Sequence, residues 1–228
     1  MLYFLLRILK VIRGKDFYVF PDLHIKKIKF GNKNAEWTIS PNNINDNSIV
    51  YSFGVGNDIS FDLAIIKNYG VKLYAFDPTP KSAIWLEKQS LPINFIFSKI
   101  GLASYDGIAE FTLPENPEHV SATMLGKTSS QGIFKADVKK LKTIMAELGH
   151  TRIDILKMDI EGAEYDVIQD IIESRLEINQ ILIEFHHRFD NVGINKSKTA
   201  IEQLKKSGYK IFDVSFTGEE ISFIKTNV

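Results

Sequence analysis

The stretch between residues 49 and 78 most constrains what this chain can fold into. It reads IVYSFGVGNDISFDLAIIKNYGVKLYAFDP. The apolar run at 49–53 predicts a buried strand, two glycines then break it, residues 59–67 can form a helix, and residues 71–76 predict a second strand. This order and spacing are typical of a βαβ crossover, which joins parallel strands. The sequence therefore predicts an α/β fold built on a parallel sheet.

Two features of this unit indicate a bound nucleoside. Gly54 and Gly56 lie at the turn after the first strand, where glycines let a ligand approach the backbone closely. Asp77 ends the second strand about 20 residues later, where a carboxylate can accept hydrogen bonds from two ribose hydroxyls. Glycines are also common where a strand simply ends, so the spacing of Asp77 carries more of the inference. We expect an adenosine-containing cofactor across the carboxyl ends of the strands.

The turn differs from the one that binds dinucleotides. Ile59 stands where the third glycine of a dinucleotide motif would be, and Asp58 places a negative charge where a pyrophosphate would lie. A cofactor without phosphates fits better, and S-adenosylmethionine is the obvious one, because its ammonium and sulfonium groups tolerate nearby carboxylates. An NAD-dependent oxidoreductase shares the βαβ unit and is kept as an alternative.

The composition is that of one globular domain. The chain has 228 residues, of which 44% are hydrophobic and 25% are charged, enough for a sizeable core. Its 28 basic and 28 acidic residues balance, so no global charge recruits nucleic acid. Since the chain has no cysteine, disulfides and thiolate zinc sites are excluded, and a cytoplasmic location is expected.

We expect residues 1–47 to form an N-terminal appendage and residues 48–228 to form the cofactor-binding domain. Residues 1–14, MLYFLLRILKVIRG, predict a basic amphipathic helix that is too short to span a bilayer and is not followed by a signal-peptide cleavage site. Such a helix can lie peripherally on an anionic inner membrane surface, or pack on the domain or on a second subunit of an oligomer. Residues 17–20 and 25–30 are expected to form a small antiparallel hairpin.

The rest of the chain continues the α/β pattern. Helices are expected at 82–89, 138–148 and 197–207, and further strands at 93–97, 108–113, 153–158, 180–187, 209–214 and 220–225. The strand at 108–113 is expected at an edge, and the last two strands as an antiparallel hairpin. Gly101 follows the third strand, where it either borders an adenine ring or only turns the chain. Residues 114–131 form a long polar loop, typical of a lid or substrate loop, in which HVSATM at 119–124 is of most interest and His119 has no assigned role.

Candidate catalytic residues follow two buried strands. Asp159 ends the first, in RIDILKMDIEGAEYDVIQDII, and Glu161 opens the next helix. Acidic residues often stabilise a helix start, which accounts for Glu161 better than for Asp159. In the second strand, QILIEFHH, His186 shares a face with Glu184 while His187 takes the other. An imidazole beside a carboxylate can be a general base or can ligate a divalent metal with Asp159, and the pattern does not separate the two histidines.

Together these segments resemble the FkbM-type methyltransferase family. The resemblance rests on VYSFGVGNDISFD, YAFDPTP, SKIGLAS, DILKMDIEGAEYDVI and LIEFHHR, and it covers roughly residues 48–225. The LKMDIEGAE block is its most specific part. The family uses S-adenosylmethionine on the class I methyltransferase fold. The resemblance thus implies a Rossmann-like, seven-stranded, mostly parallel sheet of order 3-2-1-4-5-7-6 with helices on both faces.

The resemblance also implies roles for individual residues. Phe53, Gly54 and Gly56 would surround the methionine part of the cofactor, and Asp77 would bind its ribose. Asp159 and Glu161 would lie near the transferring methyl group. We further assign Asp58, Pro78 and Gly101 to the cofactor site. Ser52 stands where the family usually has an acidic residue, whereas Asp58 and Asp62 follow later, which leaves open which group holds the cofactor's ammonium.

Family members commonly methylate hydroxyls of sugars, polysaccharide precursors or natural products. By this resemblance we expect an O-methyltransferase acting on a sugar hydroxyl of a glycan or glycolipid, or on another small molecule. In this hypothesis His186 or His187 takes the hydroxyl proton, and Asp159 orients the acceptor or a divalent cation. A non-catalytic cofactor-binding scaffold is the second alternative, since a fold does not establish an activity.

Overall fold

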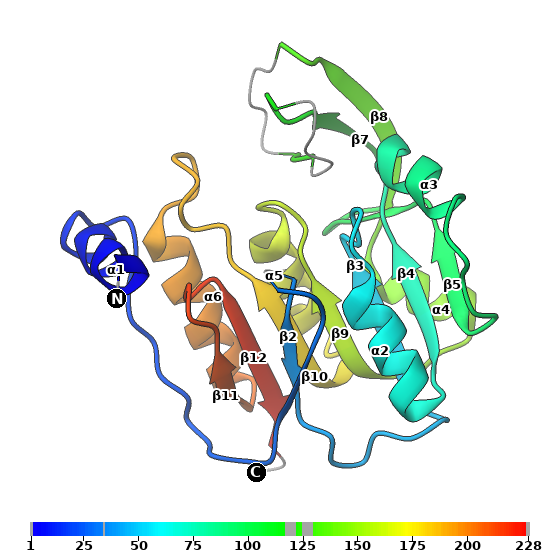
Figure 1. Ribbon diagram of the computed structural model, residues 1–228, viewed down its shortest axis with the longest axis horizontal. Helices are drawn as coiled ribbons and strands as arrows, with labels where there is room; N and C mark the ends of the chain where they lie inside the picture. Colours follow the sequence, from blue (N-terminus) through cyan, green and yellow to red (C-terminus); the bar gives the residue numbers. More distant parts are fainter. Residues whose placement is uncertain (1, 34, 117–121, 125–129, 227–228) are drawn as a thin grey trace.

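The computed structural model describes residues 2–33, 35–116, 122–124 and 130–226. Its centre is a seven-stranded sheet with the order β11-β12-β10-β9-β3-β4-β5 (Figure 1). Numbered along the chain, these strands stand in the order 3-2-1-4-5-7-6, as expected. Strand β12 is antiparallel to both of its neighbours, and the other pairs are parallel. The strands are β3 (Ile49–Phe53), β4 (Lys72–Phe76), β5 (Phe95–Ser98), β9 (Arg152–Met158), β10 (Glu177–Glu184), β11 (Tyr209–Val214) and β12 (Glu220–Lys225).

Helices cover both faces of this sheet, because successive side chains of its central strands point to opposite faces and are apolar on both. In β3, Tyr51 and Phe53 join the core beneath α4 (Leu141–Leu148), α5 (Glu164–Glu173) and α6 (Ile194–Lys206). Val50 points the other way, into the core beneath α2 (Ser60–Tyr69) and α3 (Pro80–Leu86). The predicted α/β class and class I methyltransferase-like fold are therefore confirmed.

A separate three-stranded sheet stands beside α3, near the end of β4 (Figure 1). It contains β6 (Gly101–Leu102), β8 (Ile133–Lys139) and β7 (Gly107–Thr112) in that order. The strand expected at 108–113 thus pairs with β8 and not with the main sheet. The helix expected at 138–148 begins only at Leu141, because Val138 belongs to β8 and is fully buried against this small sheet.

The N-terminal segment contains α1 (Leu2–Ile12), β1 (Ile28–Phe30) and β2 (Trp37–Ile39). The expected hairpin is wrong in its pairing: β1 lies within 25–30, but its antiparallel partner is β2, and residues 17–20 form no strand. The reason is that β2 is buried on the main sheet, where the Ser222 hydroxyl donates to Thr38 O at 2.8 Å. The domain boundary at residue 47 stays a prediction.

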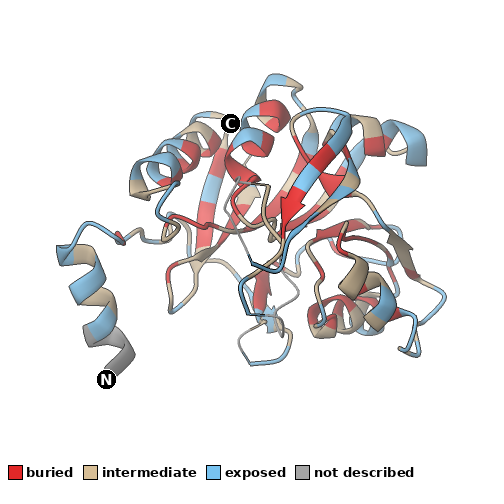
Figure 2. Cartoon of the chain, turned by 90° about the horizontal axis from the view of Figure 1, so that it is seen from above, coloured by how far each residue is buried: buried red, intermediate tan, exposed pale blue. Residues whose placement is uncertain are grey.

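Helix α1 extends from the body at the N-terminus, whereas buried residues concentrate along the central strands (Figure 2). Arg7 ties the helix to the body by donating to the backbone oxygens of Phe17 and Phe216, at 3.1 and 3.2 Å. Leu6, Leu9 and Ile12 are 46%, 46% and 75% exposed. Within the described part of the chain, none of the helices has the length and hydrophobicity that a membrane span requires.

Candidate functional site

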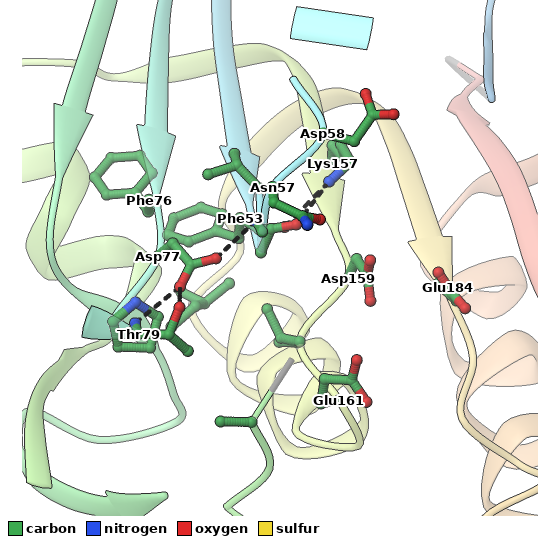
Figure 3. A pocket seen from close by; sticks show the side chains of 18 of the residues that line it. Phe53, Asn57, Asp58, Phe76, Asp77, Thr79, Lys157, Asp159, Glu161 and Glu184 are labelled. Atoms are coloured by element: carbon green, nitrogen blue, oxygen red, sulfur yellow. Dashed lines mark hydrogen bonds between the residues drawn. The ribbon is translucent and has the colours of Figure 1, made fainter. Parts of the chain in front are cut away.

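A pocket of about 240 Å³ opens at the carboxyl ends of β3, β4, β9 and β10 (Figure 3). Phe53, Phe76, Asp159 and Glu184 mark the ends of these four strands and line it. Ala122 and Met124, from the described part of the 114–131 loop, line it as well. His119 lies outside the described residues. The pocket is where parallel α/β sheets place their ligands.

The glycine turn after β3 brings the backbones of two strands together. Gly54 has φ +72°, and a Cβ built on it would lie 1.7 Å from the carbonyl oxygen of Asp159. Only glycine therefore fits between the ends of β3 and β9. The Gly56 N–H donates to Asp77 Oδ2 at 2.9 Å, which connects the turn to the tip of β4.

Asp77 is buried at this tip and its carboxylate is fixed. Its Oδ1 accepts hydrogen bonds from the Thr79 N–H at 2.8 Å and from the Thr79 hydroxyl at 2.5 Å (Figure 3). Each carboxylate oxygen has two lone-pair directions, so Asp77 retains capacity for a ligand hydroxyl. Beside it, the rings of Phe53 and Phe76 stack with centroids 4.4 Å apart and form an apolar wall. The predicted cofactor residues Phe53, Gly54, Gly56 and Asp77 thus line one continuous surface.

Three further predicted cofactor residues also line the pocket. Pro78 follows Asp77, and Gly101 approaches it so closely that a Cβ there would lie 3.3 Å from Pro78 Cγ. Asp58 accepts from the Ser60 N–H at 2.8 Å and from the Asn32 side chain at 3.2 Å. Although burial opposes it, these hydrogen bonds and the Lys157 charge hold the pKa of Asp58 below its usual value. Asp58 is therefore a carboxylate at neutral pH.

The other end of the pocket is acidic. Asp159, Glu161, Glu184 and Glu220 all line it. Burial raises the pKa of Asp159, and Lys157 and His186 oppose this shift. Burial and the Asp159 charge raise the pKa of Glu184 to about 9. At neutral pH, Glu184 is thus largely protonated.

His186 lies behind these carboxylates and is held by Glu164. Glu164 Oε1 accepts from the His186 backbone N–H at 2.9 Å and lies 3.3 Å from its Nδ1. The Nε2 atom lies 3.7 Å from Asp159 Oδ1 and 3.5 Å from Glu161 Oε2. Burial would lower the pKa of His186, but these carboxylates outweigh it and raise the pKa to about 10. The ring is therefore an imidazolium at neutral pH.

His187 lies apart from this cluster. Its ring is buried 5.1 Å from the ring of Phe17, and its Nε2 lies 3.4 Å from Asp16 Oδ1. Burial, only partly offset by Asp16, lowers its pKa to about 4, so the ring is neutral. The structure thus brings together Asp159, Glu161 and His186, and separates the two histidines that the sequence alone could not.

Asp159, Glu184 and His186 also have the arrangement of a possible cation site. Each offers one ligand atom, and the three atoms lie within 4.8 Å of one another. Carboxylates and imidazoles are ligands that divalent cations accept.

Sequence reasoning missed two contributors. Lys157 lines the pocket although it lies in a buried strand, and its only signal was a charge inside an apolar run. Thr123 donates its hydroxyl to the Glu161 carbonyl at 2.7 Å, which places Ala122 and Met124 over the pocket. Contacts this distant in sequence leave no periodic pattern.

Comparison with known proteins identifies the family of this chain. The model of the methyltransferase FkbM domain matches residues 31–211. The chain is 27% identical over 173 residues to the probable methyltransferase-like protein 24 of Homo sapiens, covering 72% of this chain and 41% of that protein. It is 26% identical over 149 residues to the hexuronic acid methyltransferase AglP of Haloferax volcanii, covering 62% of this chain and 58% of that protein. The chain thus spans less than two thirds of either relative.

Two solved structures are also similar. Methyltransferase FkbM from Methylobacillus flagellatus KT matches with a TM-score of 0.47 and 14% identity, over 79% of this chain and 44% of that chain. Fibrillarin from Aeropyrum pernix, in complex with S-adenosyl-L-methionine, matches with a TM-score of 0.43 and 11% identity, over 90% of this chain and 84% of that chain. With the family model matching most of its length, this chain belongs to the FkbM-domain methyltransferases.

Proposed function

We propose that this protein transfers a methyl group from S-adenosylmethionine to a hydroxyl of a sugar in a glycan or glycolipid. The observation that carries this proposal is a single pocket with two chemically different ends. One end has the fixed Asp77 carboxylate beside stacked aromatic rings, which suits a nucleoside. The other end has Asp159 beside the charged His186. This end suits an acceptor hydroxyl that must lose a proton.

The chemistry needs alignment and one proton acceptor. The sulfonium methyl is already activated, so the protein mainly orients the acceptor oxygen and removes its proton as the C–O bond forms and the C–S bond breaks. His186 is a poor proton acceptor because its pKa is raised to about 10. His187 is neutral but lies outside the pocket lining. We therefore assign Asp159 as the acceptor of the hydroxyl proton. Glu161 and His186 position the Asp159 side chain.

A second route to the same reaction uses a divalent cation. Asp159, Glu184 and His186 would hold it once Glu184 and His186 release their protons, and the cation would lower the pKa of the acceptor hydroxyl. Loss of turnover in a chelator, regained with Mg²⁺ or Mn²⁺, would favour this route. Unchanged turnover in the chelator would favour proton transfer to Asp159 without a metal.

The sugar acceptor is the finer part of the proposal. It is supported by the similarity to one relative, a hexuronic acid methyltransferase, and by the acidic character of the acceptor end of the pocket. Hydroxyl-rich ligands suit such a surface because they can donate hydrogen bonds to carboxylates. A scaffold without catalysis remains the competing function.

The direct test is methyl transfer from labelled S-adenosylmethionine to a panel of oligosaccharides, with and without uronic acids. Label in a sugar hydroxyl supports the proposal. Cofactor binding without transfer to any acceptor would favour the scaffold. Asp77→Ala should weaken S-adenosylhomocysteine binding roughly 10- to 100-fold, since it removes a charged acceptor of ribose hydrogen bonds. Unchanged affinity in that variant would remove the ribose assignment.

A further inference from the structure

Lys157 is a charged side chain in an unusual place. It is the penultimate residue of β9, in the middle of the main sheet, paired in register with Ser52 of β3 and Leu182 of β10. The residue is only 5% exposed. Lysines are almost never buried this deeply without a partner that justifies the loss of hydration. The position therefore calls for a functional explanation.

The ammonium group is directed to the glycine turn and reaches the pocket. Its Nζ donates to the Gly54 carbonyl at 3.1 Å and lies 3.5 Å from the Phe53 carbonyl. It also lies 4.9 Å from the centroid of the Trp37 ring, a cation–π contact. Lys157 and Trp37 both line the pocket (Figure 3 shows the lysine).

Its hydrogen bonds are incomplete. An ammonium has three donors, and the two carbonyls use two of them. Among the described residues, Lys157 forms no salt bridge within 4.0 Å. Its charge interacts with the carboxyl groups of Asp58, Asp62 and Asp159, and two of these, Asp58 and Asp159, line the same pocket. The Lys157 side chain thus lies near the Asp58 carboxylate in the lining of one pocket.

An ammonium beside a carboxylate complements the two charges of an α-amino acid zwitterion. Asp77 marks the nucleoside end of the pocket, so the glycine turn and Lys157 lie at the end left for the amino-acid part of the cofactor (Figure 3). We propose that Lys157 is the subsite for the α-carboxylate of S-adenosylmethionine, while Asp58 accepts hydrogen bonds from its α-ammonium. This inference rests on the proposed function.

Two ligands test the subsite. One is S-adenosylhomocysteine, and the other is its decarboxylated analogue, in which a hydrogen atom replaces the α-carboxylate and the ammonium is kept. Isothermal titration calorimetry should show that the wild-type chain prefers S-adenosylhomocysteine by roughly 10- to 100-fold, the range of a charged hydrogen bond. In Lys157→Met, S-adenosylhomocysteine should bind about as weakly as the analogue, and the analogue's affinity should stay within about twofold of the wild-type value. Lys157→Arg, which keeps the charge, should retain part of the preference.

Further controls separate the subsite from the fold. Because Lys157→Met leaves Asp62 buried without its neighbouring cation, the double variant Lys157→Met/Asp62→Asn removes both charges and should show the same loss of preference. Equal wild-type affinity for the two ligands would overturn the subsite and leave the cofactor intact. A preference that persists in Lys157→Met would overturn it too. Failure of the wild-type chain to bind either ligand would overturn the proposed cofactor itself.

Discussion

Replacing Gly54 by alanine tests the close approach on which the pocket depends. The residue has φ +72°, so any side chain costs about 1–2 kcal/mol of backbone strain. The added Cβ would also lie 1.7 Å from the Asp159 carbonyl oxygen, and the two strand ends must separate to relieve this overlap. Separation breaks the 3.1 Å hydrogen bond that the Asp159 N–H donates to Phe53 O. It also strains the 2.9 Å hydrogen bond that the Gly54 N–H donates to Phe76 O. Each of these losses costs about 1 kcal/mol. The total is about 3–4 kcal/mol.

Gly149 provides a matched control. It has the same φ of +72°, but a Cβ there meets nothing within 4 Å, so Gly149→Ala should cost only the strain of about 1–2 kcal/mol. Urea unfolding of the two variants should differ by about 2 kcal/mol, a gap of roughly 4–8 °C in melting temperature for a chain of this size. Gly54→Ala should also lose S-adenosylhomocysteine binding. Equal destabilisation by the two substitutions would refute the steric argument.

Three more predictions concern the acceptor end, the buried histidine and α1. Asp159→Asn should lower turnover roughly 100-fold or more while leaving S-adenosylhomocysteine affinity within a few-fold, and unchanged turnover would refute its role as proton acceptor. His187 has a folded pKa of about 4 against 6.5 unfolded, so the unfolded chain binds the proton first. The contribution of His187 to the free energy of unfolding should be fully present above pH 6.5 and should fall by roughly 3 kcal/mol as the pH decreases toward 4. His187→Gln should flatten this pH dependence. An unaltered pH dependence in denaturant titrations would contradict the assignment. Helix α1 exposes Leu6, Leu9 and Ile12 beside basic residues, so flotation with anionic liposomes should require residues 1–14, and equal flotation without them would exclude membrane contact.

The sequence predicted the fold well because the fold depends on local patterns. Apolar runs, turn glycines and the Asp77 spacing are all visible within windows of about 30 residues, and they specify strands β3, β4 and β9 and their crossover. The pairing of β1 with β2 was missed, because its driving force is the burial of Trp37 against a sheet formed by residues far along the chain. Local pattern does not contain that contact.

The sequence predicted several of the residues that line the pocket, but not their charge states. The strand expected at 180–187 ends at Glu184, so alternation does not extend to His186, although the ligand atoms of Glu184 and His186 lie within 4.8 Å of each other. That His186 is an imidazolium depends on Glu164 and Glu161, which reach it from the start of α5 and the turn before it. Lys157 was missed because a lysine in a strand carries no sign of what its ammonium touches, and only the fold brings it to Gly54.

The most direct test of the central claim is thermal unfolding with S-adenosylhomocysteine, with NAD as the control. A ligand at 100 times its dissociation constant should stabilise the chain by about 2.7 kcal/mol, roughly 5–11 °C. We predict a shift with S-adenosylhomocysteine and none with NAD. A shift with NAD alone would contradict the assignment of the pocket to S-adenosylmethionine.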